Sequence, residues 1–175
     1  MKRPSTRHSP VSRAIASHGL LALCLAAALS LSACDRVEKL EEGLATEEQV
    51  RKEFGEPVTV TIDADGSRTF EYPRQPEGWT NYRIKFGPDG KMSSLRQLLN
   101  DDNFARIQPG MTQAEVRERL GRPAAMQKYA LKNEEVWEWR YKPLQEPRLF
   151  SVTFDDQGRV RATATGDDPR EMQRG

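Results

Sequence analysis

Cysteine and histidine are scarce in this chain, and their positions matter more than their number. His8, His18 and Cys24 lie in the first 33 residues, and the only other member of the set is Cys34. The rest of the sequence therefore has no thiol nucleophile, no serine–histidine–aspartate machinery and no histidine or cysteine zinc site. It has no disulfide either, so packing must hold the fold. We predict no metal, no cofactor and no enzymatic activity, since other chemistry would need a deep cleft around a buried carboxylate.

The chain also lacks an apolar run long enough to cross a membrane. Its longest such run, residues 19–31, falls well short of the roughly 20 residues that a transmembrane helix needs. Four basic residues and no acidic residue precede it, which is typical of a signal peptide. We therefore predict that residues 1–33 are a signal peptide that is removed.

Ser32 and Ala33, directly before Cys34, resemble the lipobox of bacterial lipoproteins. The resemblance implies that Cys34 becomes the new N-terminus and carries lipid, which would anchor the protein in the cell envelope with its globular part in the periplasm. An aspartate directly after the lipidated cysteine, here Asp35, is associated in enteric bacteria with the inner membrane. We favour the outer membrane and keep the inner membrane open. The alternative is an ordinary secretory signal cut near Ala33, with Cys34 a spare thiol.

A surplus of positive charge is missing as well. The whole chain has 27 Lys and Arg against 26 Asp and Glu, and the predicted signal peptide removes four of the basic residues. The remainder is weakly acidic, which excludes nucleic acid as a partner because that needs clustered, uncompensated cations. Acidic turns such as Asp155-Asp156 lack the ligand ladder of a calcium loop, and hairpin turns explain them.

What the sequence does contain is an internal duplication. Thr46 begins a capping box that Gln49 completes, and Thr112 begins a second one with Glu115. The pairs that match at an offset of 66 are Thr46 and Thr112, Val50 and Val116, Gly55 and Gly121, and Pro57 and Pro123. Phe86 and Gly90 match Phe154 and Gly158 at an offset of 68. Several matches at nearly one spacing indicate a repeated structural unit.

Each copy is predicted to contain short helices followed by a three-stranded antiparallel meander, so the fold class is α+β. Apolar and polar residues alternate through residues 58–62, as is typical of strands. Trp139 and Tyr141 share one face of a later strand, and we assign them to the core. Residues 94–107 are predicted to be helical with a break near Asn100.

These elements define the predicted domain boundaries. The signal peptide is residues 1–33, the first repeat is residues 34–93 and the second repeat is residues 94–164. Residues 165–175 are polar and lack an apolar period, so we predict a disordered tail there.

The second copy carries a family likeness. It contains Ile107-Gln108-Pro109-Gly110-Met111-Thr112, Leu120-Gly121-Arg122-Pro123, Trp139-Arg140-Tyr141 and Phe154-Asp155-Asp156-Gln157-Gly158-Arg159-Val160. These stretches resemble the SmpA/OmlA (BamE-like) domain. The resemblance implies an envelope lipoprotein that assists the machine inserting β-barrel proteins into the outer membrane. Tandem copies also resemble the β-lactamase inhibitory protein architecture, so the alternative is a tandem-repeat inhibitor or regulator of a periplasmic enzyme.

Candidate contact residues for a protein partner lie in two loops. Trp79 sits in a loop rich in proline where little obliges burial, and we group Arg74 and Tyr82 with it as an exposed contact patch. The alternative is a loop that folds back on its own sheet. Leu144 and Arg148 belong to the equivalent loop of the second repeat and form the second candidate.

Overall fold

The computed structural model describes residues 37–172. The predicted signal peptide, the predicted lipidation site Cys34 and the following Asp35 lie outside these residues. Within the described part, no helix combines the length and the apolar character needed to cross a membrane. All described residues fall in one structural unit, which spans residues 35–175.

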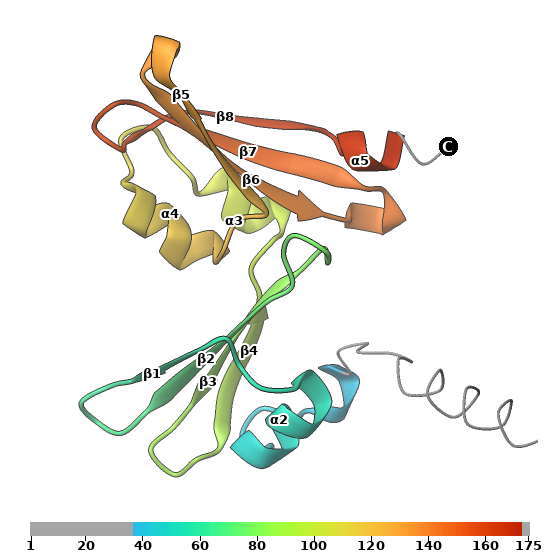
Figure 1. Cartoon of the computed structure of the whole chain (residues 1–175). Helices are drawn as coiled ribbons and strands as arrows, with labels where there is room; N and C mark the ends of the chain where they lie inside the picture. Colours follow the sequence, from blue (N-terminus) through green and yellow to red (C-terminus); the bar gives the residue numbers. More distant parts are fainter. Residues whose placement is uncertain (1–36, 173–175) are drawn as a thin grey trace, which may run out of the picture. The chain divides into compact units, whose positions relative to one another are not determined.

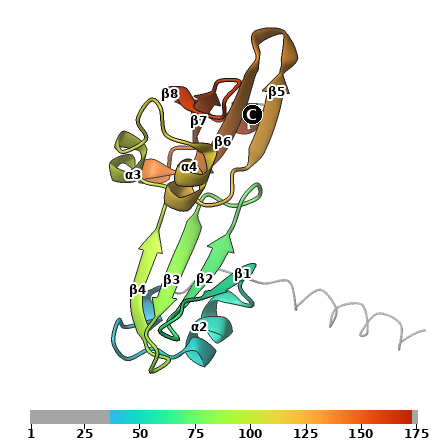
Figure 2. The same ribbon diagram turned by 90° about the vertical axis from the view of Figure 1, so that its left-hand side faces the viewer.

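The first repeat packs one helix against a four-stranded antiparallel sheet, and Figure 2 shows its strands side by side in chain order. Thr46 caps the helix, because its hydroxyl accepts the Gln49 N–H while the Gln49 side chain accepts the Thr46 N–H. Val50 and Phe54 are buried against the sheet. The elements are η2 (Val37–Lys39), α2 (Glu47–Phe54), β1 (Thr59–Ile62), β2 (Arg68–Pro73), β3 (Asn81–Phe86) and β4 (Met92–Gln97).

The second repeat is built in the same order (Figure 1). Its helices are α3 (Asp101–Ala105) and α4 (Gln113–Leu120), and its four-stranded sheet contains β5 (Ala125–Tyr129), β6 (Glu134–Tyr141), β7 (Arg148–Phe154) and β8 (Val160–Asp167). The short elements η3 (Ala130–Lys132), η4 (Pro143–Gln145) and α5 (Pro169–Met172) lie between or after these strands. The predicted α+β fold of two similar units is therefore confirmed.

The likeness extends to single hydrogen bonds. In the first repeat the Met92 N–H donates to the Ala45 carbonyl at 2.8 Å, and in the second the Val160 N–H donates to the Met111 carbonyl at 2.7 Å. Both bonds tie the segment before the capped helix to the last strand. The same devices thus close both units.

The meanders have four strands, where the sequence predicted three. Residues 94–107 are not one helix, because β4 runs to Gln97 and the helix begins only after Asn100, whose side chain accepts the Asn103 N–H. After the hairpin at Gly90 the chain runs back along β3 and hydrogen-bonds to it. The leucines of this segment fit the spacing of a helix as well as that of a strand, so pairing with β3 makes it a strand. The boundary between repeats consequently falls after Gln97 and not at residue 93.

The predicted disordered tail is also corrected. β8 continues to Asp167 and pairs with β7 along its length, and α5 follows it. Asp168 is buried between these two elements. Its partners come from distant parts of the chain, so the local polar sequence gave no sign of order. Residues 173–175 lie outside the described part.

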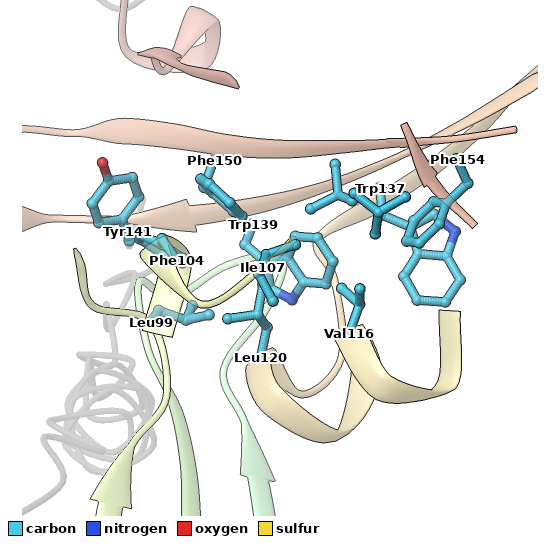
Figure 3. Packing of buried hydrophobic residues seen from close by; sticks show 12 residues of the cluster. Leu99, Phe104, Ile107, Val116, Leu120, Trp137, Trp139, Tyr141, Phe150 and Phe154 are labelled. Carbon is cyan, nitrogen blue, oxygen red and sulfur yellow. The ribbon is translucent and has the colours of Figure 1, made fainter. Parts of the chain in front are cut away.

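Each repeat has its own hydrophobic core. In the second repeat, twelve buried residues from α3 and the segments beside it, α4 and the sheet form one cluster. Figure 3 shows Trp139 between Leu120 of α4 and Phe150 of β7. Trp139 and Tyr141 are buried in this cluster, which confirms their assignment to the core. The first core joins α2 to the inner face of its sheet through residues such as Phe70.

Candidate functional site

The loop between β2 and β3, which belongs to the first repeat, contacts the second repeat. The Gln75 side chain donates through Nε2 to the Arg140 carbonyl at 2.7 Å, and its Oε1 accepts the Arg140 N–H at 3.2 Å. β5 pairs with β6 only as far as Glu138. Arg140 of β6 therefore lies beyond the end of β5 and has no β5 residue opposite it. The Gln75 amide therefore satisfies the backbone groups that β5 leaves open.

The Arg140 guanidinium is the charged centre of this junction. Its Nε donates to Asp168 Oδ2 at 2.5 Å, Nη1 donates to the Pro76 carbonyl at 2.9 Å and Nη2 donates to Glu171 Oε1 at 3.1 Å. The Trp79 ring lies 4.1 Å from the guanidinium carbon, which is a cation–π distance. Arg140 is 5% exposed and Asp168 2% exposed. A buried charge of this kind persists because it is paired and hydrogen-bonded.

A second contact joins the repeats at the end of α4. The Asn81 Nδ2 group donates to the Leu120 carbonyl at 2.7 Å and to the Arg122 carbonyl at 2.8 Å. The Trp139 Nε1–H reaches the intervening Gly121 carbonyl at 3.2 Å. The last carbonyls of a helix have no partner within it, so a strand of the first repeat caps a helix of the second.

The three residues predicted as one exposed patch in the first loop lie in two places. Arg74 donates through Nη2 to the Phe54 carbonyl at 2.8 Å, and Tyr82 packs edge-on against the Phe54 ring at 5.2 Å. Trp79 instead packs on Arg140, and all three predicted residues are half-buried. The structure thus brings Arg74 and Tyr82 together at the end of α2. Their role in binding a partner stays a prediction.

The second predicted loop is more accessible. Leu144 is 98% exposed and has φ 46° and ψ 33°, a left-handed conformation that is uncommon for a leucine. Arg148 is half-buried and its Nη1 lies 2.9 Å from Asp167 Oδ1. An apolar side chain held at a loop tip in a sparsely populated conformation is a feature that clusters at functional sites. Leu144 is therefore the strongest of the five predicted contact residues.

Two of the grooves at the junction are lined by residues of both repeats. The larger, about 780 Å³, is lined from both repeats by residues that include Arg83, Arg96, Arg106 and Arg119. Arg83 donates to Glu71 and to Glu118 at 2.8 Å each, so it bridges the two repeats. The smaller groove, about 260 Å³, lies beside Trp79 and Pro143. The carboxylates that line the larger groove are exposed, which suits a binding surface better than acid–base chemistry.

Glu115, one of the carboxylates that line the larger groove, has a lowered pKa. The backbone N–H of Thr112, and then its hydroxyl, hold the pKa of Glu115 below its ordinary value, because both hydrogen bonds favour the charged carboxylate. Glu115 completes the capping box of α4. Its ionisation is therefore tied to helix stability.

The junction residues Gln75, Asn81, Arg140 and Asp168 were missed by sequence reasoning. Arg140 alternates with buried aromatic residues and so looks like a solvent-facing position. Asn81 and Gln75 border a strand and a loop where polar residues are ordinary. No local signal distinguishes them, because their partners are far away in the sequence. Gln75, Asn81 and Arg140 contact the other repeat, and Asp168 pairs with Arg140.

Solved structures similar to this chain include a putative osmotically inducible lipoprotein, OsmE, with 23% identity over 44% of this chain and 88% of that chain, at a TM-score of 0.36. A putative beta-lactamase inhibitor protein from Streptococcus mutans has 13% identity over 74% and 92%, at a TM-score of 0.34. A third, YjgB from Bacillus subtilis, has 16% identity over 74% and 82%, at a TM-score of 0.29.

No curated protein matches the chain by sequence. A family profile does match, at residues 97–164. That stretch contains α3, α4, the strands β5 to β7 and most of β8. The second repeat of this chain is therefore similar to the outer membrane protein assembly factor BamE domain.

Proposed function

We propose that this protein is a lipid-anchored periplasmic binding protein that acts as an accessory in the assembly of outer-membrane β-barrel proteins. The match of residues 97–164 to the domain of an outer membrane protein assembly factor is the observation that carries the proposal. No enzyme family is indicated by the comparisons. Binding, rather than catalysis, is the activity that the exposed loops and open grooves support.

The partner-binding surface in this proposal centres on Leu144. Its side chain is exposed and lies beside the smaller groove, whose lining includes the neighbouring Pro143 and the ring of Trp79. Apolar and aromatic side chains of this kind are the anchors on which protein interfaces depend. Arg148 would form the polar rim, and Arg74 and Tyr82 would contribute through the loop that they support.

The lipid on Cys34 would make a weak contact sufficient. The acyl chains of a lipoprotein hold it at the membrane, whereas one chain gives only marginal binding. Confinement near membrane partners raises the effective concentration, so a small surface can act without high intrinsic affinity. We place the anchor in the outer membrane, facing the periplasm.

Photo-crosslinking in cells tests this proposal. A photoreactive residue at position 144 is compared with one at Leu131, a leucine that is equally exposed at the tip of another hairpin. We expect crosslinks from position 144 to components of the barrel-assembly machine and few from position 131. Crosslinks from position 144 to a soluble periplasmic enzyme would instead support an inhibitor or regulator and refute the assembly role.

A further inference from the structure

β1 is an edge strand that leaves apolar side chains uncovered. It borders only β2 in the first sheet (Figure 1). Val60 is 42% exposed and Ile62 is 66% exposed, and Val58 just before the strand is exposed too. Val60 and Ile62 share one face, because successive side chains in a strand alternate. A free edge and an exposed apolar row therefore coincide.

The same two strand residues present unpaired backbone groups. The hairpin after β1 closes through the Asp63 N–H, which donates to the Ser67 carbonyl at 2.9 Å. Bonded and non-bonded pairs alternate along an antiparallel ladder, so Thr61 faces β2 whereas Val60 and Ile62 turn their N–H and C=O groups outward. No hydrogen bond from residues 37–172 reaches these outward groups outside the ladder.

The second repeat shows what a protected edge looks like. In β5, Met126 stands where the first repeat has Val60, and Lys128 stands where it has Ile62, at the same offset of 66. The lysine is exposed and its Nζ lies 3.8 Å from Glu135 Oε2. A lysine on an edge strand opposes pairing with another chain, because an incoming strand would have to accommodate its charge. The charged Lys128 therefore protects the β5 edge at the position where β1 has the apolar Ile62.

The two remaining edges are also less suited to pairing through apolar side chains. On β4, the Glu42 carboxylate accepts the Leu95 N–H at 2.9 Å and so occupies part of that edge. β8 carries only alanine, threonine and glycine between Arg161 and Asp167, which offers little apolar surface. β5 also exposes Met126 and Tyr129, but Lys128 interrupts its apolar face. Among the described edge strands, β1 is the one on which two successive residues of one face, Val60 and Ile62, are both apolar and exposed.

We propose that β1 accepts an extended partner strand that carries apolar side chains at every second position. Residues paired with Val60 and Ile62 would lie on the same face as these side chains and cover them, while the alternate residues would face Thr59 and Thr61. This is strand addition to a sheet edge, in which backbone hydrogen bonds give affinity and the alternating side chains give specificity. Strands of outer-membrane barrels have this period-two pattern. The ligand would then be an unassembled barrel strand, an assignment that rests on the proposed function.

A second copy of this chain fits the edge less well. β1 has four residues and spans only about 13 Å. Two such strands would bury far less than the roughly 1,200 Å² that stable protein interfaces reach at their lower limit. A small, reversible contact suits a passing strand held near the membrane, and does not suit a permanent dimer.

Peptide binding to the full lipidated protein in nanodiscs tests the inference. The probe is a fluorescent ten-residue peptide that alternates leucine and threonine, and its scrambled isomer is the control. We expect the alternating peptide to bind at least about tenfold more tightly, and Ile62→Lys to weaken it by about tenfold or more, because the change copies the guarded edge. Met126→Lys on β5 is the matched control and should leave binding unchanged. Lys128→Ile should create a second binding site.

Equal binding of both peptides, or binding unaffected by Ile62→Lys, overturns the inference. So does sedimentation showing a stable dimer that Ile62→Lys dissociates, since β1 would then serve a second copy. Methylation of the peptide nitrogens that face Val60 and Ile62 should abolish binding, whereas a merely apolar contact would survive it. Crosslinks from position 144 to the assembly machine without peptide binding would refute the inference and leave the proposed function standing.

Discussion

Helices α2 and α4 are built from the same local signals, yet their C-terminal ends are completed differently. Each begins at a threonine that forms a capping box, and each stops at a glycine, Gly55 with φ 80° and ψ −165° or Gly121 with φ 71° and ψ −161°. The end of α2 receives Arg74 from its own repeat. The end of α4 receives Asn81 from the other repeat. Duplicated sequence therefore fixes the helix, while the partner unit decides how its end is satisfied.

The sheets differ in the same manner. The end of β6 next to Arg140 is completed by the Gln75 side chain of the first repeat, and Asp168 beyond β8 pairs with the Arg140 guanidinium. At the free edge of β1, no side chain from residues 37–172 forms a corresponding hydrogen bond. The two repeats therefore differ in which of their backbone groups are covered. Groups that contact the other repeat are hydrogen-bonded by it, and groups that do not contact it stay accessible to other partners. The following variants test that view.

Breaking the junction should have the largest effect. Asp168→Ala leaves the buried Arg140 guanidinium without its closest carboxylate, and we expect a loss of about 3–5 kcal/mol in the free energy of unfolding. The neighbouring Asp167→Ala removes only an exposed pair with Arg148 and should lose less than about 1 kcal/mol. Urea denaturation followed by tryptophan fluorescence measures both. Equal losses would show that the junction contributes no more than the surface pair.

Substituting the two stop glycines separates local strain from contact between repeats. Gly55→Ala and Gly121→Ala both place a side chain in a glycine-favoured backbone conformation, which costs about 1–3 kcal/mol. At position 121 the new Cβ would meet the other repeat, 3.1 Å from Asn81 Nδ2. At position 55 it would meet no atom of the described residues within 4 Å. Gly121→Ala should therefore lower the melting temperature more. Identical melting temperatures for the two variants would contradict this role of Asn81.

The helix caps should respond equally, because they are local. Thr46→Ala and Thr112→Ala each remove the hydroxyl that accepts the backbone N–H three residues later, and each should lose about 1 kcal/mol. Thermal unfolding of the two single variants provides the measurement. A loss confined to one variant would mean that the surrounding repeat, and not the cap itself, sets the contribution.

The smallest expected effect is a difference in acid response. The pKa of Glu115 is lowered in the folded protein, so its contribution to stability is present above the unfolded pKa and is lost as the pH falls through the folded pKa. Gln49, at the equivalent position, does not titrate. Glu115→Gln should therefore reduce the stability lost between about pH 6 and about pH 3. Parallel stability curves for the variant and the parent protein would refute this assignment.

Much of the fold could be predicted from the sequence. The capping boxes, the glycine stops and the strand alternation are local signals, because each depends on backbone hydrogen bonds within a few residues. The offset between copies identified the duplication for the same reason. Residues 94–97 could not be assigned correctly, since their pairing with β3 and not their own periodicity makes them a strand.

The candidate site depended more heavily on tertiary structure. Trp79 and Leu144 attract attention in the sequence as large apolar residues in loops, but only the fold shows that Trp79 packs on Arg140 while Leu144 stays exposed. The sequence by itself determined two capped helices, their stops and the alternating strands. Tertiary structure decided which polar residues are buried and which strand edge is open, because burial depends on contacts between residues far apart in the chain.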